Sequence, residues 1–235
     1  MGHKKIGLLG GTTPESTVAY YLYFTREYTR RHGDFGFPEI LIYSVQFQQF
    51  MEWSQSGQWD RAAEKVVEAF DSLKAAGADF GMLTANTPHV IFDEVARRTS
   101  LPLLSILDVT VEAVSEAKLK VVGLLGTMTT MNSPMYPDAL SAQGMETLLP
   151  EAGDRELLSR IIYEELSSGV IREESKREYL RVIGELEQRG AQGIILGCTE
   201  IQMLIRQDDT PVPLFDTTTI HAERALQIAT GQSDL

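Results

Sequence analysis

The stretch GADFGMLTANT at residues 77–87 returns as GAQGIILGCTE at residues 190–200, and this repeat decides the fold. Each copy opens with a glycine typical of a helix end and continues as a short apolar run typical of a buried strand. A second pair supports the first, because IGLLGGT at residues 6–12 is similar to VGLLGTM at residues 122–128. The chain therefore contains two similar halves. In the longer repeat, Ala85 takes the place of Cys198.

Short apolar runs alternate with longer amphipathic segments along the whole chain, which is typical of parallel strands buried between helices. The pattern predicts strands at residues 5–9, 39–45, 80–84, 103–106, 121–125, 194–196 and 212–215. It predicts helices at residues 15–31, 59–76, 133–143, 154–168, 176–189 and 219–230. Residues 46–58 lack a clear period and are expected to form a mobile loop.

The predicted fold class is α/β, with two pseudo-symmetric three-layer lobes that each contain a mostly parallel sheet. Parallel sheets bind ligands beyond the carboxyl ends of their strands, so we expect the active site in the cleft between the lobes. We place the first lobe at residues 1–101 plus 212–235 and the second at residues 102–211. In this division the strand that begins near Val212 returns to the first lobe.

The composition is that of an ordinary globular chain, with 43% hydrophobic and 23% charged residues among 235. A net charge of −12 argues against nucleic acid or an anionic membrane as the partner. No apolar run approaches the roughly 18 residues of a membrane-spanning helix. One cysteine cannot form an internal disulfide, which fits a reducing compartment, so we expect a cytoplasmic protein with a small-molecule partner.

Cys198 lies between Gly197 and Thr199 at the end of a predicted strand. A lone cysteine is often an inert core residue. The flanking glycine and the turn into a helix favour the alternative, a thiol exposed in the cleft. In that case a helix N-terminus is expected to lower the thiol pKa from about 8.5 toward the thiolate.

Small polar residues follow the other predicted strands and are candidate ligands for a substrate carboxylate. Each has a structural alternative: a plain tight turn at Gly10–Thr13, or helix capping by the Asn and Thr side chains. The functional interpretation is an anion site made of backbone N–H groups and short side-chain donors. The candidate substrate-binding residues are Gly11, Thr12, Asn86, Thr87, Thr127, Thr129, Thr130 and Thr199.

Histidines and acidic residues give weaker signals. His221 lies near the start of the last predicted helix, where imidazole stays neutral, so we expect a hydrogen-bonding partner there. His89 either orients a group in the cleft or packs on a helix face. Glu200 is a further candidate for a supporting role. No Cys-x-x-Cys or clustered-histidine pattern occurs, and no metal site is predicted.

Together these segments resemble the aspartate/glutamate racemase superfamily, and more narrowly its aspartate racemase branch. The resemblance runs from end to end in family order. It implies a homodimeric isomerase that works on an amino acid without pyridoxal phosphate, metal or other cofactor. In the family, two cysteines usually carry protons on opposite faces of the α-carbon. The segments that carry the resemblance are residues 6–17, 85–89, 125–127, 197–200 and 216–221.

Carried over residue by residue, the resemblance makes Cys198 one acid/base and places Ala85 at the position of the other. A methyl group cannot accept a proton, so the other face would need a water held by Thr84, Asn86 or Thr87, or the substrate's own groups, or no base at all. We therefore expect a weak or one-sided activity. No residue is clearly suited to hold a substrate side-chain carboxylate, although Arg172 and Lys176 are candidates.

Three functions remain open from the sequence. The first is a cofactor-independent racemase for an acidic or other small amino acid. The second is a decarboxylase or lyase with a single cysteine, like the arylmalonate decarboxylase of the same superfamily, in which one cysteine protonates one face of a carbanion. The third is an amino-acid-binding relative without catalysis.

Overall fold

The computed structural model describes residues 2–235. They form two compact units, the first containing residues up to Ile106 and from His221 on, the second containing Leu107–Ile220. Each unit holds a four-stranded, entirely parallel sheet. The two-lobed α/β fold class predicted from the repeat is therefore confirmed. No helix among the described residues is long and apolar enough to cross a membrane.

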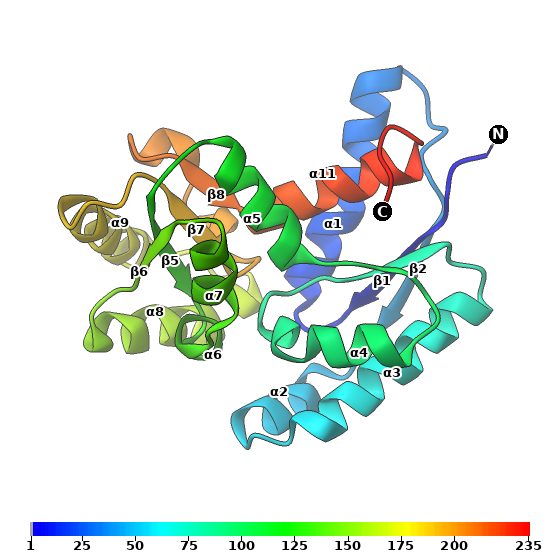
Figure 1. Cartoon of the computed structure of the whole chain (residues 1–235), viewed down its shortest axis with the longest axis horizontal. Coiled ribbons are helices and arrows are strands. Elements are labelled where there is room, and N and C mark those ends of the chain that lie inside the picture. Colours follow the sequence, from blue (N-terminus) through cyan, green and yellow to red (C-terminus); the bar gives the residue numbers. More distant parts are fainter. Residues whose placement is uncertain (1) are drawn as a thin grey trace. The chain divides into compact units, whose positions relative to one another are not determined.

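The first sheet has the strand order β2-β1-β3-β4. Figure 1 shows α3 along one side of it and α1 with α11 along the other. Its strands are β1 (Ile6–Gly10), β2 (Ile40–Ser44), β3 (Phe80–Leu83) and β4 (Leu103–Leu104). Its helices are α1 (Pro14–His32), α2 (Phe47–Gln55), α3 (Trp59–Ala75), the 3-10 turn η1 (Thr87–Ile91), α4 (Phe92–Arg98) and most of α11 (Thr217–Ala229).

The second sheet has the strand order β6-β5-β7-β8, which repeats the order of the first sheet. In chain order, β5, β6, β7 and β8 therefore correspond to β1, β2, β3 and β4. Its strands are β5 (Val121–Gly126), β6 (Glu146–Leu148), β7 (Ile194–Gly197) and β8 (Leu214–Asp216). Its helical elements are most of α5 (Ile106–Glu116), α6 (Met128–Asn132), α7 (Met135–Ala142), α8 (Ala152–Glu164), η2 (Leu166–Ser168), α9 (Glu173–Gln188), α10 (Ile201–Leu204) and η3 (Gln207–Asp209).

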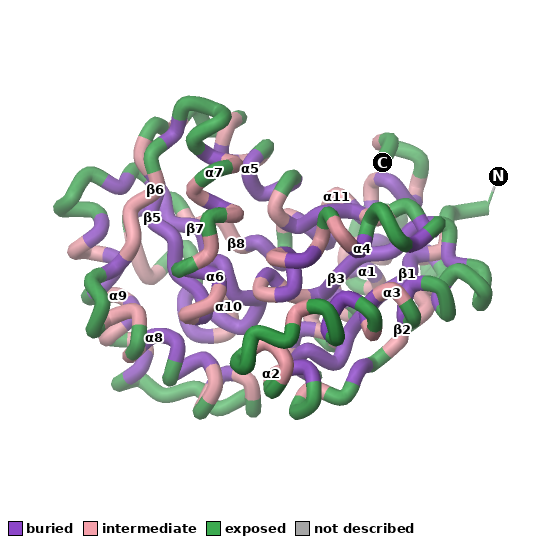
Figure 2. The backbone as a smooth tube through the Cα atoms, turned by 60° about the horizontal axis from the view of Figure 1, so that its bottom comes forward, coloured by how far each residue is buried: buried purple, intermediate pink, exposed green. Residues whose placement is uncertain are grey.

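Continuous burial of the central strands explains their unbroken apolar runs. Every residue of β1, β3 and β7 is buried, and Figure 2 shows β1, β3, β5 and β7 as buried segments. Alternate side chains of the second sheet enter different cores, because successive strand residues point to opposite faces. Leu125 and Leu196 pack with α8 and α9, whereas Leu124 and Ile195 pack with α5 and α7.

The predicted lobe boundary was wrong at both crossings. Residues 214–216 form β8, which pairs with β7 in the second sheet and does not return to the first. β4 pairs with β3, so the first unit extends past residue 101. The physical reason is that hydrogen-bond pairing between distant segments decides which sheet a strand joins, and residues 214–216 pair with residues 194–196. The strand β6 was not predicted.

The predicted loop at residues 46–58 was also wrong, because most of it is the helix α2. Its apolar residues do not run in a long stripe, yet Phe50 is buried against the core of the first unit. The remaining predicted helices agree with α1, α3, α7, α8, α9 and α11 to within a few residues at each end.

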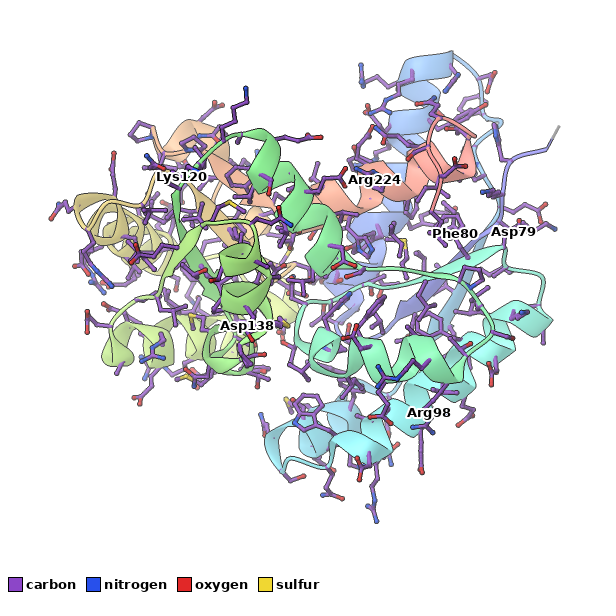
Figure 3. The ribbon with its side chains drawn as sticks, in the orientation of Figure 1. Asp79, Phe80, Arg98, Lys120, Asp138 and Arg224 are labelled. Atoms are coloured by element: carbon purple, nitrogen blue, oxygen red, sulfur yellow. The ribbon has the colours of Figure 1, made fainter. Side chains whose placement is uncertain are left out.

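The amino ends of both sheets are fixed by structural contacts. Asp79, labelled in Figure 3 just before β3, accepts a hydrogen bond from the Lys5 N–H at 2.6 Å. Lys120, labelled just before β5, donates its N–H to Gln192 Oε1 at 2.7 Å. The candidate site residues lie at the opposite, carboxyl ends.

Gly11, directly after β1, has the most constrained glycine position at these carboxyl ends. Its φ is +82°, and a Cβ there would lie 2.5 Å from the Val45 carbonyl oxygen and 2.6 Å from the Val45 nitrogen. Gly33, at the end of α1, has a similar φ of +75° but open space around it. The turn therefore needs glycine at residue 11 both for its backbone angle and for its close approach to the next strand.

We expect Gly33→Ala to lower the free energy of unfolding by about 1 kcal/mol, the usual cost of a left-handed backbone angle. Gly11→Ala should cost about 3 kcal/mol or more, because the added methyl also meets backbone atoms that cannot rotate away. Chemical denaturation of both variants measures the difference. Equal losses would mean that the Val45 backbone yields and that the close approach is unimportant.

Candidate functional site

In the first unit, the candidate residues gather where β1 and β3 end side by side. The register pairs Leu9 with Leu83, so the Gly11–Thr12 turn lies beside Ala85 and Asn86. Thr12 and Asn86 are buried, at 6% and 2% exposure, while Ala85 is half-buried. This edge therefore presents short neutral groups.

Thr12 differs from its neighbours because its hydroxyl oxygen is buried with no hydrogen-bond partner among the described residues. A buried hydroxyl without a partner is costly, which favours a ligand or a water there. Gly11, by contrast, already donates its N–H to Thr17 Oγ1 at 2.9 Å. Gly11 therefore shapes the turn, and Thr12 is the better candidate for contact with a ligand.

Thr84 is poorly placed to replace a missing base. It is fully buried, and its hydroxyl donates to the Leu9 carbonyl at 3.1 Å. Its own carbonyl accepts a hydrogen bond from the buried Ser16 hydroxyl. These contacts fix the end of β3 and turn the Thr84 side chain into the sheet.

His89 fixes the backbone of Ala85. The Ile106 N–H donates to His89 Nε2 at 3.1 Å, so the ring proton must be on Nδ1, which donates to the Ala85 carbonyl at 2.9 Å. The ring stacks on Phe92 at 4.9 Å between centroids. Of the two alternatives for His89, orientation of a site group is supported, in the form of a backbone contact.

His221 makes an analogous buried network beside it. Its Nε2 donates to the Leu104 carbonyl at 3.1 Å, and its Nδ1 accepts from the Tyr20 hydroxyl at 2.9 Å. Burial lowers the pKa of His221 to about 3 and that of His89 to about 4. The neutral His221 predicted from the sequence is the form that these bonds require, but its cause is burial and not a helix N-terminus.

In the second unit, Cys198 and Glu200 form a buried, hydrogen-bonded pair after the end of β7. The strand ends Gly126 and Gly197 are register partners, which brings Thr127 and Cys198 next to each other. Cys198 Sγ donates to Glu200 Oε2 at 2.9 Å, and the Thr199 hydroxyl donates to the same oxygen at 3.0 Å. All of these side chains are buried, and Cys198 is 8% exposed.

The expected direction of the thiol pKa shift was wrong. Burial raises the pKa of Cys198 well above its ordinary value, and the charge of Glu200 raises it further. The expected lowering required a substantial helix N-terminus. Instead, α10 has only four residues and begins after Glu200, so its field is weak at the sulfur. The resting group is therefore a protonated thiol hydrogen-bonded to a carboxylate.

In the turn after β5, backbone N–H donors already have hydrogen-bond partners within the second unit. Thr127 caps α6, accepting the Thr130 N–H at 3.2 Å, and the two hydroxyls lie 3.1 Å apart. The Met128 N–H donates to Ser159 Oγ at 3.0 Å. Thr130 is fully buried within this turn, and Thr129 is half-buried on α6. A carboxylate site here would depend on side-chain hydroxyls more than on these backbone groups.

The two cationic residues considered for binding a substrate side-chain carboxylate form ion pairs with other residues. Lys176 Nζ lies 2.6 Å from Asp209 Oδ1. Arg172 is largely exposed and lies 4.0 Å from Glu165. Neither belongs to the Cys198 cluster. Among residues 2–235, no three His, Cys, Asp or Glu side chains are grouped as metal ligands.

Tyr163, on α8, is a further residue of this cluster that was not predicted from the sequence. Its hydroxyl hydrogen-bonds to the side chain of Thr127 and interacts electrostatically with Cys198 and Glu200. Burial is the main cause that raises its pKa to about 12, so it stays protonated at neutral pH. The available signal was the four-residue spacing of Ser159 and Tyr163, which places both on one helix face.

Comparisons with known proteins identify relatives of this chain along most of its length. The profile of a family described as Asp/Glu/Hydantoin racemase matches residues 9–225. A structure from Yersinia pestis, described as a candidate Asp/Glu racemase, is 41% identical, with a TM-score of 0.87 over 97% of this chain and 99% of that one. An aspartate racemase homologue of Pyrococcus horikoshii is 37% identical, with a TM-score of 0.82 over the same shares. The broad specificity amino-acid racemase RacX of Bacillus subtilis is 23% identical over 93% of this chain and 95% of its own length.

The buried histidines predict a defined acid sensitivity. Unfolded histidines bind protons near pH 6.5, whereas His89 and His221 do so only near pH 4 and pH 3. The unfolded chain therefore binds more protons in this window. The stability due to neutral imidazoles is complete above about pH 6.5 and is lost as the pH falls through it.

We expect each of these histidines to account for about 3 kcal/mol of the unfolding free energy lost between pH 6.5 and pH 4. His89→Asn should lower the stability at pH 7 and flatten the acid slope, whereas His32→Asn, at an exposed position, should leave the profile unchanged. Urea denaturation across this range gives the slopes. Parallel profiles for all three proteins would contradict the assignment.

Proposed function

Because this chain belongs to the Asp/Glu/hydantoin racemase family, we propose that it moves the α-proton of an amino acid without a cofactor, using Cys198 as its single acid/base. The observation that carries the proposal is the buried contact of the Cys198 thiol with Glu200 at a strand end. It gives the only cysteine of the chain an immediate proton acceptor.

In the proposed removal step, the thiol proton passes to Glu200 along the existing hydrogen bond, leaving a thiolate beside a neutral carboxylic acid. The thiolate takes the α-proton, and the electron pair of the C–H bond moves into the substrate carboxylate as an enolate. Hydroxyl donors are suited to this developing charge. Thr127 is one candidate, because it follows the strand end paired with that of Cys198.

In the proposed return step, the thiol gives a proton back to the carbanion, and Glu200 returns its proton to the sulfur. Cys198 reaches only one face of the α-carbon. On the other face the family position is Ala85, which has no group able to carry a proton. Exchange with retention should therefore be faster than inversion. The unpartnered Thr12 hydroxyl is the best-placed group to hold a water for the slower inversion.

The remaining candidates take supporting roles in this proposal. Asn86, Thr87, Thr129 and Thr199 hold the α-carboxylate or order the strand ends, and Gly11 shapes the turn beside Thr12. Since Arg172 and Lys176 are engaged elsewhere, the proposal covers small neutral amino acids as well as acidic ones. Homodimer formation and a cytoplasmic location stay predictions from the resemblance and the cysteine content.

A second candidate function, a decarboxylase with a single cysteine, is favoured by one specific observation. The raised thiol pKa keeps Cys198 protonated at rest, which is the state needed to protonate a carbanion produced by loss of carbon dioxide. That reaction needs no base at Ala85. Release of carbon dioxide from a malonate-type acid, without deuterium exchange into amino acids, would select it.

The first test is α-proton exchange in deuterated water, followed by NMR for both enantiomers of aspartate, glutamate and several neutral amino acids. The proposal predicts deuterium incorporation mainly with retention, from one enantiomer. Cys198→Ser should lower the rate at least about 100-fold, the usual contribution of a general acid/base. Unchanged exchange in that variant would remove Cys198 from the mechanism.

A gain of function tests the missing base. Ala85→Cys places a thiol at the half-buried position that the family resemblance assigns to the second acid/base, and we expect inversion to rise about tenfold or more relative to exchange with retention. Ala85→Ser is the matched control, because its hydroxyl is a poor base and should leave the ratio near that of the parent protein. If both variants behave like the parent, Ala85 does not face the α-carbon.

A further inference from the structure

Polar side chains on one face of α8 form hydrogen bonds with the short helix α6, which follows β5. Arg155, Ser159 and Tyr163 are four residues apart, so they share one face of α8. Each bonds to a different place on or next to α6. Arg155 Nη1 donates to Asn132 Oδ1 at 2.6 Å, Ser159 Oγ accepts the Met128 N–H at 3.0 Å, and Tyr163 bonds to the Thr127 side chain. We call these three residues the α8 clamp.

The clamp gives α6 an order that it lacks on its own. α6 contains five residues, far fewer than a helix needs for stability in isolation. Ser159 is 6% exposed and takes a backbone donor that would otherwise be buried without a partner. Two of the three clamp contacts fall on Thr127 and Met128, so the clamp acts mainly on the turn.

That turn is adjacent to the Cys198–Glu200 pair. Thr127 follows Gly126, and a Cβ at Gly126 would lie 2.9 Å from the carbonyl oxygen of Gly197, the residue before Cys198. The two backbones are therefore in direct contact at the strand ends. A shift of the Thr127 turn would alter the surroundings of the thiol without changing any residue of the Cys198–Glu200 pair.

We propose that Ser159 and Tyr163 are positioning residues, which hold the Thr127 hydroxyl beside Cys198 so that a carboxylate can bind next to the sulfur. This inference rests on the proposed function for its biological meaning, but its geometry does not require turnover. Neither residue needs to exchange a proton with the substrate. Their role is to keep one hydrogen-bond donor at a fixed place during proton transfer.

Alkylation of the single cysteine tests this directly. Iodoacetate and iodoacetamide react alike: the sulfur–carbon bond forms, iodide leaves and the thiol proton goes to solvent. Only iodoacetate carries a carboxylate. The ratio of the two rates therefore reports a carboxylate site beside Cys198, even in a protein without racemase activity. Mass spectrometry of the intact chain measures both rates.

We expect Tyr163→Phe and Ser159→Ala each to lower the iodoacetate-to-iodoacetamide ratio about 5- to 10-fold relative to the parent protein. Ser159→Thr, which retains the hydroxyl, should recover most of the ratio. Tyr136→Phe is the matched control, because it also removes a buried tyrosine hydroxyl from the second unit, in the core cluster on the other face of the sheet. That control should leave the ratio within twofold.

Ratios within twofold of the parent in both clamp variants would overturn the proposal, as would an equal fall in Tyr136→Phe. If Tyr163→Phe fails to fold, Ser159→Ala and its threonine counterpart decide the question, since they change one small side chain within a helix. A lowered ratio together with absent deuterium exchange would keep the clamp and reject the racemase proposal. Deuterium exchange together with an unchanged alkylation ratio would support the racemase proposal and reject the clamp.

Discussion

The hydrogen bond between the Cys198 thiol and the Glu200 carboxylate is the interaction on which the proposed chemistry of this chain depends. Both side chains are buried at the end of β7, where water cannot easily replace either partner. Burial and the neighbouring charge keep the proton on sulfur at rest. The same contact gives that proton a destination when a substrate needs a base. The pair can thus exchange a proton internally with no change in its total charge.

The two units show how a duplicated fold can diverge at one position. Their sheets have the same strand order, and β3 of the first corresponds to β7 of the second. At the end of β7 there is a thiol with an acceptor. At the end of β3 there is a methyl group, whose backbone carbonyl is held by a neutral histidine. The first unit has kept the architecture of a site, with an unpartnered Thr12 hydroxyl, but lacks an evident acid/base at residue 85.

Sequence patterns predicted what depends on local burial and on the repeat. The central strands are buried on both faces, so their apolar runs and the matching Gly77 and Gly190 turns revealed two parallel sheets. The edge strand β6 was missed because Glu146, Thr147 and Leu148 are exposed or half-buried and form no apolar run. β8 was assigned to the wrong unit, since strand pairing between distant segments leaves no mark in a single sequence.

The sequence predicted candidate residues at strand ends but not their electrostatics. Cys198, Thr127 and Thr199 were chosen because they follow predicted strands, and the structure places them after the paired ends of β5 and β7. The raised thiol pKa was not found, because it depends on the depth of burial and on the direction in which the Glu200 side chain points. Tyr163 was missed for the same reason: its contact with Thr127 joins a helix and a turn that are 36 residues apart. Tertiary contacts of this kind decide the protonation state.

The most direct test of the Cys198–Glu200 pair is the pH dependence of iodoacetamide alkylation of Cys198 in the parent protein and in Glu200→Gln. The parent should react slowly at neutral pH, with a midpoint above that of an ordinary thiol, near 8.5. Replacing Glu200 by glutamine removes the negative charge that favours the thiol and leaves a neutral amide oxygen, which is a weaker acceptor, so the midpoint should move to lower pH. A midpoint that stays in place or moves to higher pH would contradict the account.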